Sequence, residues 1–374
     1  MTLSDNTALV MTSPRSPFSV AVVPHPHPGP DQVVVRARAV AVNPFDRLIQ
    51  TAGDIMTPFL RYPAVVGIDV AGEVTAIGAD VTRFQLGDRV VGFAAGTDKT
   101  RNQAGEGAFQ TFVVLLEHMT SPIPPSLSFE DAAVLPLGLA TAASALFQSD
   151  YLALHAPSAR AEARGQTLLV WGGSTSVGTN AVQLAVAAGY DVIATASPHN
   201  FALMRTLGAT AVFDYRDPGV VHDVVSALRG RTAAGAIAIG PGSASPCIDI
   251  LGASQGNRFV AMATPAASFD QVRAGRGHRR SLVPAIVRMA AGSVSLALRA
   301  RRNKVVAKMI WGSTLVSNAV GPMIFQDFLP SALAQGRYAA APRAEIVGTG
   351  LAAIPTALER QRRGVSATKL VVRV

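Results

Sequence analysis

The sequence predicts an α/β protein of two domains, a small β-barrel and a doubly wound parallel sheet. Three observations support this prediction. A chain of 374 residues is too long for one ordinary core. Its first third consists of short strands separated by glycines, and its middle alternates apolar strands with helices. We assign residues 1–137 and 338–374 to the barrel domain, and residues 138–337 to the parallel-sheet domain.

The barrel is predicted from alternating strands. Residues 31–42 alternate apolar and polar positions after a proline-rich lead. A second β-rich run covers 65–81, and the turn Gly87-Asp88 leads to a third at 89–94. The last strand, 366–374, also alternates, and we expect it to return to the barrel.

The parallel sheet is predicted from strand–helix units that follow a helix over 129–147, for which Ser128 is a plausible N-cap. The predicted strands are 167–172, 191–197, 211–215, 235–240, 258–264 and 305–311. The predicted helices are 179–189, 201–209, 221–230, 325–335 and 354–364. This alternation is typical of a sheet covered by helices on both faces.

The net charge of +9 is local. Ten Lys or Arg residues and no acid lie between Val272 and Lys308, and the charges of the remaining chain almost cancel, so a nucleic-acid-binding surface is not supported. The single cysteine, Cys247, excludes an internal disulfide. No signal peptide is evident, and the apolar window 282–298 is broken by Pro284, Arg288 and Gly292. We expect a soluble cytoplasmic protein, either a monomer or a homodimer.

The basic segment is an insertion at about 267–304, with apolar residues at helical spacing and arginines at its end. The favoured interpretation is an exposed, mobile, solvated helix added to the second domain. An amphipathic lid or a membrane-surface helix on anionic lipid is a less favoured alternative. A docking patch for an acidic carrier protein is another.

A glycine-rich turn, Trp171–Gly178, follows a predicted strand and opens a helix. Glycines there let the backbone approach a pyrophosphate, and the helix N-terminus favours anions. Serines stand where glycine is more usual, at Ser174 and Ser176. The candidate dinucleotide contacts are Gly172, Gly173, Ser174, Thr175, Ser176 and Val177.

The end of the next strand favours NADPH over NADH. An NAD enzyme normally carries an acid there for the ribose 2′-hydroxyl. Residues 195–200 contain no acid, and Ser197, His199 and Asn200 offer polar groups to a 2′-phosphate instead. These residues are also compatible with a simple helix N-cap.

Several motifs in order resemble the medium-chain dehydrogenase/reductase superfamily. They are Asn43-Pro44-Phe45-Asp46, Gly67-Ile68-Asp69-Val70-Ala71-Gly72, Gly87-Asp88-Arg89-Val90, Leu135-Pro136-Leu137-Gly138, Asp214-Tyr215 and Gly364-Val365-Ser366 with Lys369. The resemblance covers about Val20 to Val374 except the basic segment. It implies a GroES-like catalytic barrel beside a Rossmann domain, most similar to zinc-independent trans-enoyl reductases and quinone-reductase-like proteins.

The resemblance also implies site residues. Further cofactor contacts would be Asn43, Pro44, Asp46, Thr141, Tyr215, Met262, Ala263, Val365 and Ser366. Substrate contacts would be Leu135, Gly138, Leu139, Ile310, Trp311 and Thr314.

The expected chemistry follows from a departure from the zinc enzymes of this superfamily. They carry His-Glu where this chain has Ile68-Asp69, and Ile68 cannot bind a metal. We therefore expect the protein to bind no metal. The expected reaction is hydride transfer from NADPH to an activated C=C in an enoyl thioester or enone, which is either a small molecule or an acyl group on a carrier protein. Quinone reduction is the alternative, and a nucleotide-sensing or scaffold protein the non-enzymatic one. No dedicated proton donor is evident; Tyr62 is a candidate, although a structural role is favoured for it, as for Asp69 in a barrel hydrogen bond.

Overall fold

The computed structural model describes residues 5–266, 272 and 278–374. Its chain divides into two compact units. Unit 1 comprises 1–137, 269–281 and 316–374, and unit 2 comprises 138–268 and 282–315. Residues 316–337, which we predicted to belong to the second domain, group with unit 1 instead. His118 Nε2 lies 3.0 Å from the carbonyl oxygen of Val316 there.

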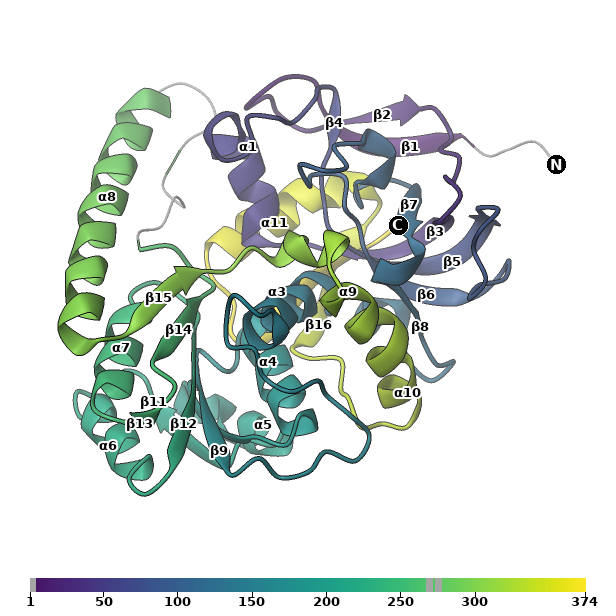
Figure 1. Ribbon diagram of the computed structural model, residues 1–374. Helices are drawn as coiled ribbons and strands as arrows, with labels where there is room; N and C mark the ends of the chain where they lie inside the picture. The colour runs from purple at the N-terminus through teal and green to yellow at the C-terminus, as the bar shows by residue number, and fades with distance from the viewer. Residues whose placement is uncertain (1–4, 267–271, 273–277) are drawn as a thin grey trace. The chain divides into compact units, whose positions relative to one another are not determined.

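Unit 1 is built on β-sheets (Figure 1). The larger sheet among the described residues of unit 1 has the order β16-β17-β3-β5-β6-β8, with β7 also paired to β3. Its strands are β3 (Gln32–Ala41), β5 (Asp69–Ile77), β6 (Arg89–Phe93), β7 (Phe112–Leu116), β8 (Thr120–Pro122), β16 (Arg343–Thr349) and β17 (Thr368–Arg373). A smaller sheet holds β1 (Asn6–Met11), β2 (Ser19–Val23) and β4 (Ala64–Val65). The return of the last strand to the barrel is confirmed, because β17 pairs antiparallel with β3.

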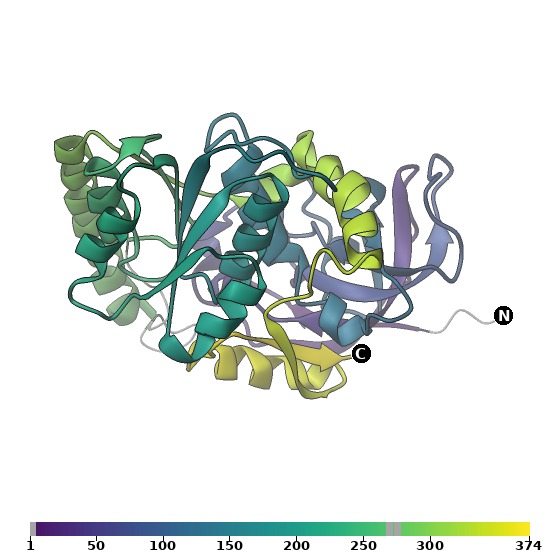
Figure 2. The ribbon, with the colours of Figure 1, turned by 90° about the horizontal axis from the view of Figure 1, so that it is seen from below.

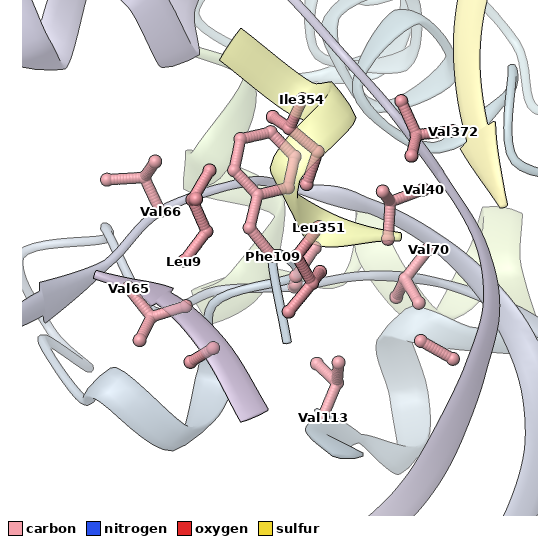
Figure 3. Close-up of a cluster of buried hydrophobic side chains, with 14 of the residues drawn as sticks. Leu9, Val40, Val65, Val66, Val70, Phe109, Val113, Leu351, Ile354 and Val372 are labelled. Atoms are coloured by element: carbon pink, nitrogen blue, oxygen red, sulfur yellow. The ribbon is translucent and has the colours of Figure 1, made fainter. Parts of the chain in front are cut away.

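The unit 1 core lies between these sheets and two helices, α1 (Pro44–Met56) and α11 (Ile354–Arg362). Figure 3 shows Phe109 among branched side chains such as Val40 and Val70. Gly67, with φ of 95°, makes room for this ring, since a Cβ there would lie 2.3 Å from Phe109 Cδ1. Short helical segments complete the unit: η1 (Ala104–Glu106), η2 (Glu117–Met119), α2 (Phe129–Ala132), α9 (Val320–Pro322), η5 (Met323–Phe328), α10 (Leu329–Ala334) and η6 (Leu351–Ala353).

Unit 2 contains the predicted doubly wound sheet. Its strand order is β11-β10-β9-β12-β14-β15, all parallel, and β13 (Gln255–Gly256) also pairs with β12. The strands are β9 (Gln166–Trp171), β10 (Asp191–Ala196), β11 (Ala211–Asp214), β12 (Thr232–Ala238), β14 (Phe259–Met262) and β15 (Val306–Met309). Counted along the chain this is the order 3-2-1-4-5-6 of dinucleotide-binding sheets, which bind ligands at the carboxyl ends of the strands where the order reverses. That point lies between β9 and β12.

Helices cover both faces of the unit 2 sheet (Figure 2). They are α3 (Pro136–Phe147, which begins in unit 1), α4 (Ser176–Ala187), α5 (Phe201–Thr206), α6 (Val220–Ala227), α7 (Ala244–Gly252) and α8 (His278–Asn303), with short turns η3 (Pro198–Asn200) and η4 (Gly312–Ser317). The single helix predicted over 129–147 is wrong, because the structure has two helices, α2 and α3. The helix predicted over 325–335 is divided between η5 and α10.

The basic segment forms the long helix α8, which runs continuously through Pro284 and Gly292. The helix predicted for this segment from its apolar spacing is therefore confirmed. The proline lies in the second turn of the helix, close to its N-terminal end, where few backbone hydrogen bonds are lost. Residues 267–271 and 273–277 of the predicted insertion lie outside the described residues. Deleting all of Val272–Lys308 would also remove most of β15, which pairs with β14, so the segment as a whole is not dispensable to the sheet.

Candidate cofactor-binding and catalytic site

The glycine-rich turn lies at the carboxyl end of β9, the central strand of the unit 2 sheet. Thr195 on the neighbouring strand β10 fixes this turn: its Oγ1 accepts from the Gly172 N–H at 3.1 Å, and its carbonyl oxygen accepts from the Gly173 N–H at 2.8 Å. Thr175 caps α4, because its Oγ1 accepts from the Gly178 N–H at 3.0 Å. Helix α4 therefore begins where a pyrophosphate binds in this fold.

Close packing explains the glycines of this turn. Gly172 has a φ of 86°, and a Cβ there would lie 2.6 Å from the carbonyl oxygen of Ile239 on the β12 side. A Cβ on Gly178 would lie 2.3 Å from the carbonyl oxygen of Gly172. Both distances are too short for real side chains. The turn is thus a tight backbone cradle at the switch point of the sheet, and its residues fit a dinucleotide.

The carboxyl ends of β10 and β11 carry the residues predicted for the adenosine phosphate. Ala196 pairs with Asp214, so Ser197 and Tyr215 follow at the same level of two adjacent strands. Ser197 and Asn200 are buried, whereas Tyr215 is exposed. The Arg216 guanidinium lies 5.1 Å from the ring centroid of Tyr215. Arg216 is not among the predicted contacts, although its cation follows directly after Tyr215, a predicted phosphate contact.

The other predicted positions of unit 2 lie at the ends of β12, β14 and β15 and on α3. The Ala263 N–H donates to the Ala238 carbonyl oxygen at 2.9 Å, and the Ile310 N–H donates to that of Met262 at 2.8 Å. Met262 at the nicotinamide edge and Ile310 of the predicted substrate stretch are therefore neighbours.

Helix α3 connects the two groups of predicted residues within unit 2. A Cβ on Gly138 would lie 2.4 Å from Ser176 Oγ, and a Cβ on Gly312 would lie 2.8 Å from Thr141 Oγ1. Within α3, Gly138 therefore packs against Ser176 at the glycine-rich turn. Thr141, one turn later, packs against Gly312, two residues before Thr314. Trp311 and Thr314 are exposed, while Leu139 is fully buried and acts as a packing residue.

In unit 1 the structure assembles a buried polar network around Asp69. Asn43, which precedes α1, donates from Nδ2 to Asp69 Oδ2 at 2.9 Å. The Lys369 ammonium on β17 lies 2.9 Å from the same oxygen and also donates to Asn43 Oδ1. The Leu137 N–H donates to Asp69 Oδ1 at 2.7 Å. Asn43, Asp69 and Lys369 are all buried, so the charges of Asp69 and Lys369 depend on each other.

Asp46 is a fourth buried polar residue next to this network. Its Oδ2 accepts from the Asn43 N–H at 2.8 Å, while its buried Oδ1 has no hydrogen-bond partner within the described chain. Burial first, and the negative charge of Asp69 second, raise the pKa of the Asp46 carboxyl from 3.8 to about 7. Near neutral pH the folded protein therefore holds a proton there that the unfolded chain releases.

Replacing Asp46 with asparagine is expected to remove one source of pH dependence from stability. The pKa of Asp46 is higher in the folded protein than in the unfolded chain, so protonation of this carboxyl stabilises the fold. This stabilisation is complete below about pH 4 and is lost as the pH rises through about 7. The free energy of unfolding of the wild type should therefore fall relative to D46N over this range, by at most about 1.4 kcal/mol per pH unit. Urea unfolding of both proteins at several pH values measures this, and parallel profiles would contradict the assignment.

The remaining predicted residues of unit 1 take different positions. Pro44 begins α1, and Leu135 is fully buried. Val365 and Ser366 are exposed in the loop between α11 and β17. The Tyr62 hydroxyl is buried without a hydrogen-bond partner among the described residues, and burial followed by the charge of Asp54 raises its pKa. A tyrosine that holds its proton more firmly is a weaker acid, so the structure gives Tyr62 no activation as a donor.

The prediction that Asp69 is a hydrogen-bonded barrel residue is confirmed, whereas no role in the site was predicted for Lys369. A signal was present: each charge is followed directly by apolar residues that read as a buried strand, Asp69 by Val70-Ala71 and Lys369 by Leu370-Val371-Val372. Two opposite charges in buried strands are expected to pair.

Comparison with known proteins identifies the family. Residues 29–125 match the alcohol dehydrogenase GroES-like domain. The dehydrogenase pigH of Monascus ruber is 48% identical over 354 residues, which cover 94% of this chain and 95% of that protein. The chain belongs to the medium-chain dehydrogenase/reductase superfamily. The trans-enoyl reductase himH of Aspergillus japonicus is 34% identical and covers 92% of this chain and 90% of its own length.

Solved structures of this superfamily share the fold. An alcohol dehydrogenase superfamily protein from Novosphingobium aromaticivorans has a TM-score of 0.73 at 22% identity and covers 99% of both chains. A quinone oxidoreductase from Pseudomonas syringae has a TM-score of 0.67 at 22% identity, over 99% of this chain and 100% of its own. The protein is accordingly an oxidoreductase of this superfamily that uses a nicotinamide cofactor.

Proposed function

We propose that this protein is a zinc-independent, NADPH-dependent reductase of an activated C=C in an enoyl thioester or enone. The observation that carries the proposal is Ile68, an apolar side chain buried next to Asp69 where the zinc enzymes of the superfamily have a histidine. The carboxylate of its neighbour Asp69 pairs with Lys369 and accepts a hydrogen bond from Asn43. Without a Lewis acid, an acceptor that is already polarised is the easier substrate.

The residues of each unit would contribute binding and orientation. When bound, the cofactor supplies the hydride. The turn from Gly172 to Gly178 would hold its pyrophosphate, and Met262 and Ala263 would lie along its nicotinamide edge. In unit 1, the Asp69–Lys369 pair fixes Asn43 at the start of α1, where the resemblance places another contact. Water is the proposed proton source.

The proposed preference for NADPH rests on the ends of β10 and β11. Ser197 and Asn200 carry no charge that would repel a 2′-phosphate, and Arg216 adds a cation next to Tyr215. Arginine near this position accommodates the 2′-phosphate in NADP-dependent enzymes.

NADPH is expected to bind at least about tenfold more tightly than NADH, a difference of about 1.4 kcal/mol. Replacing Ser197 with aspartate should reverse the order, because a carboxylate repels the phosphate and accepts from a free ribose hydroxyl. Calorimetric titration of both cofactors measures this, with Ser226→Asp on α6 as a control that should leave both affinities unchanged. Equal affinities in the wild type would contradict the preference.

The purified protein is expected to contain no stoichiometric zinc, and chelators should leave its activity unchanged. Ile68 offers no ligand, and Cys247 is fully buried in the unit 2 core. Elemental analysis together with activity after dialysis against chelator checks this. One zinc ion per chain would overturn the zinc-independent mechanism.

The reaction itself is tested by NADPH oxidation with enoyl thioesters, enones, quinones and simple ketones, each as a free small molecule and, for the thioesters, on a carrier protein. We expect turnover of the thioesters or enones with formation of the saturated product. Turnover of quinones alone would make the protein a quinone reductase. Tight NADPH binding without turnover of any acceptor would favour a nucleotide-sensing role. A cytoplasmic location and a monomer or homodimer complete the proposal.

A further inference from the structure

Helix α8 exposes an apolar face. Five large side chains on it are between 43% and 65% exposed: Val283, Ile286, Val287, Val294 and Leu298. The helix has 26 residues, and only 11% of its most apolar window is buried. A continuous row of large apolar side chains on a helix is normally covered by protein or lipid, and here the outward side is uncovered.

The apolar residues line one side of the helix. At about 100° per residue, Val283, Val287, Ala290, Val294 and Leu298 recur every three or four positions and form a stripe about 22 Å long. The opposite seam, which includes Leu282, Ala285, Leu296 and Ala300, is buried or partly buried. We call the outward side the α8 stripe.

Arginines bracket the α8 stripe at both ends. Arg279 and Arg280 precede it and Arg301 and Arg302 follow it, all exposed. By helical spacing Arg279, Arg280 and Arg301 project to the same side as the stripe. The sequence contains no Asp or Glu between residues 271 and 326. The surface is therefore apolar along its middle and cationic at its two ends.

From this pattern we infer that the α8 stripe docks onto an anionic lipid surface, with α8 lying in the plane of the membrane interface. Acyl chains would cover the valines and Leu298, and lipid phosphates would pair with the arginines, whose long stems let the charged ends reach the headgroups. A second copy of the chain fits less well, because two paired stripes would bring arginines together without a carboxylate from either helix.

The inward seam opposes a membrane-spanning arrangement. Arg299 Nε donates to Asp249 on α7 at 2.8 Å, and Ala300 and Leu296 belong to the unit 2 core. A crossing helix would lose these contacts. The other stretch long and apolar enough to span a membrane in the described chain, Phe129–Phe147, is 72% buried, as expected for core helices.

The test is co-sedimentation of the full chain with phosphatidylcholine vesicles, with and without phosphatidylserine. We expect the protein to bind anionic vesicles at least about tenfold more tightly than neutral vesicles. Binding to the anionic vesicles should weaken when the salt concentration is raised from about 0.05 M to 0.5 M. Val287→Glu/Val294→Glu should bind at least about tenfold more weakly. Arg279→Gln/Arg280→Gln/Arg301→Gln/Arg302→Gln should lose the preference for anionic lipid. Val22→Glu, at a 70% exposed position on β2, is the matched control and should bind like the wild type.

Circular dichroism and thermal unfolding confirm that each variant is folded. A wild type that ignores both kinds of vesicle would overturn the inference. So would a dimer in solution that Val287→Glu/Val294→Glu converts to a monomer, because the α8 stripe would then be covered by a second copy. Protein that resists release by alkaline carbonate would indicate a spanning helix and contradict docking in the interface plane.

Discussion

Replacing Lys369 with methionine is expected to lower the free energy of unfolding by about 3–5 kcal/mol, because it leaves the Asp69 carboxylate buried without its cation. Methionine keeps most of the volume of the lysine stem, so the loss reports the missing charge rather than a cavity. Urea or thermal unfolding at neutral pH measures it.

Two further variants make this expectation specific. Arg373→Met, on the same strand, removes a solvent-exposed pair with Glu130 and should cost no more than about 1 kcal/mol. The double variant Lys369→Met/Asp69→Asn should recover part of the lost stability, since no charge remains unpaired. Equal losses for Lys369→Met and Arg373→Met would show that the buried pair is not important for stability.

Replacing Gly178 with alanine is expected to weaken NADPH binding by at least about tenfold, and to cost about 1–3 kcal/mol of stability through overpacking. The new Cβ would lie 2.3 Å from the Gly172 carbonyl oxygen and 2.6 Å from that of Gly173. Both are backbone atoms of the glycine-rich turn, so the turn and α4 must separate. Fluorescence titration with NADPH measures the affinity.

Gly219→Ala is the matched control in the same unit. Gly219 has an ordinary φ of −86°, and the nearest atom to an added Cβ is the side-chain oxygen Asp217 Oδ1 at 3.3 Å. This variant should bind NADPH as the wild type does. Unchanged affinity in Gly178→Ala would mean that the turn is not the pyrophosphate site.

The sequence by itself determined the elements with a local signature. Alternating apolar strands and helices predicted the parallel sheet, and the Trp171–Gly178 turn predicted its ligand-binding end, because hydrophobic period and glycine spacing are properties of neighbouring residues. Ile68 likewise identified the departure from the zinc enzymes without any structure. The period was a poorer guide to interruptions, because the stretch from Phe129 divides into α2 and α3.

Only the tertiary structure decided which distant residues meet. Lys369 and Asn43 are 326 residues apart, and β17 and the start of α1 bring them to Asp69, where burial makes each depend on the others. The raised pKa of Asp46 has the same origin, since desolvation is set by packing. The outward side of α8 was also undecided, because an apolar period of a helix does not say which side the protein covers. The burial of Ala300 and the Arg299–Asp249 pair show which side of α8 faces the protein, since only one side of this helix can pack on α7.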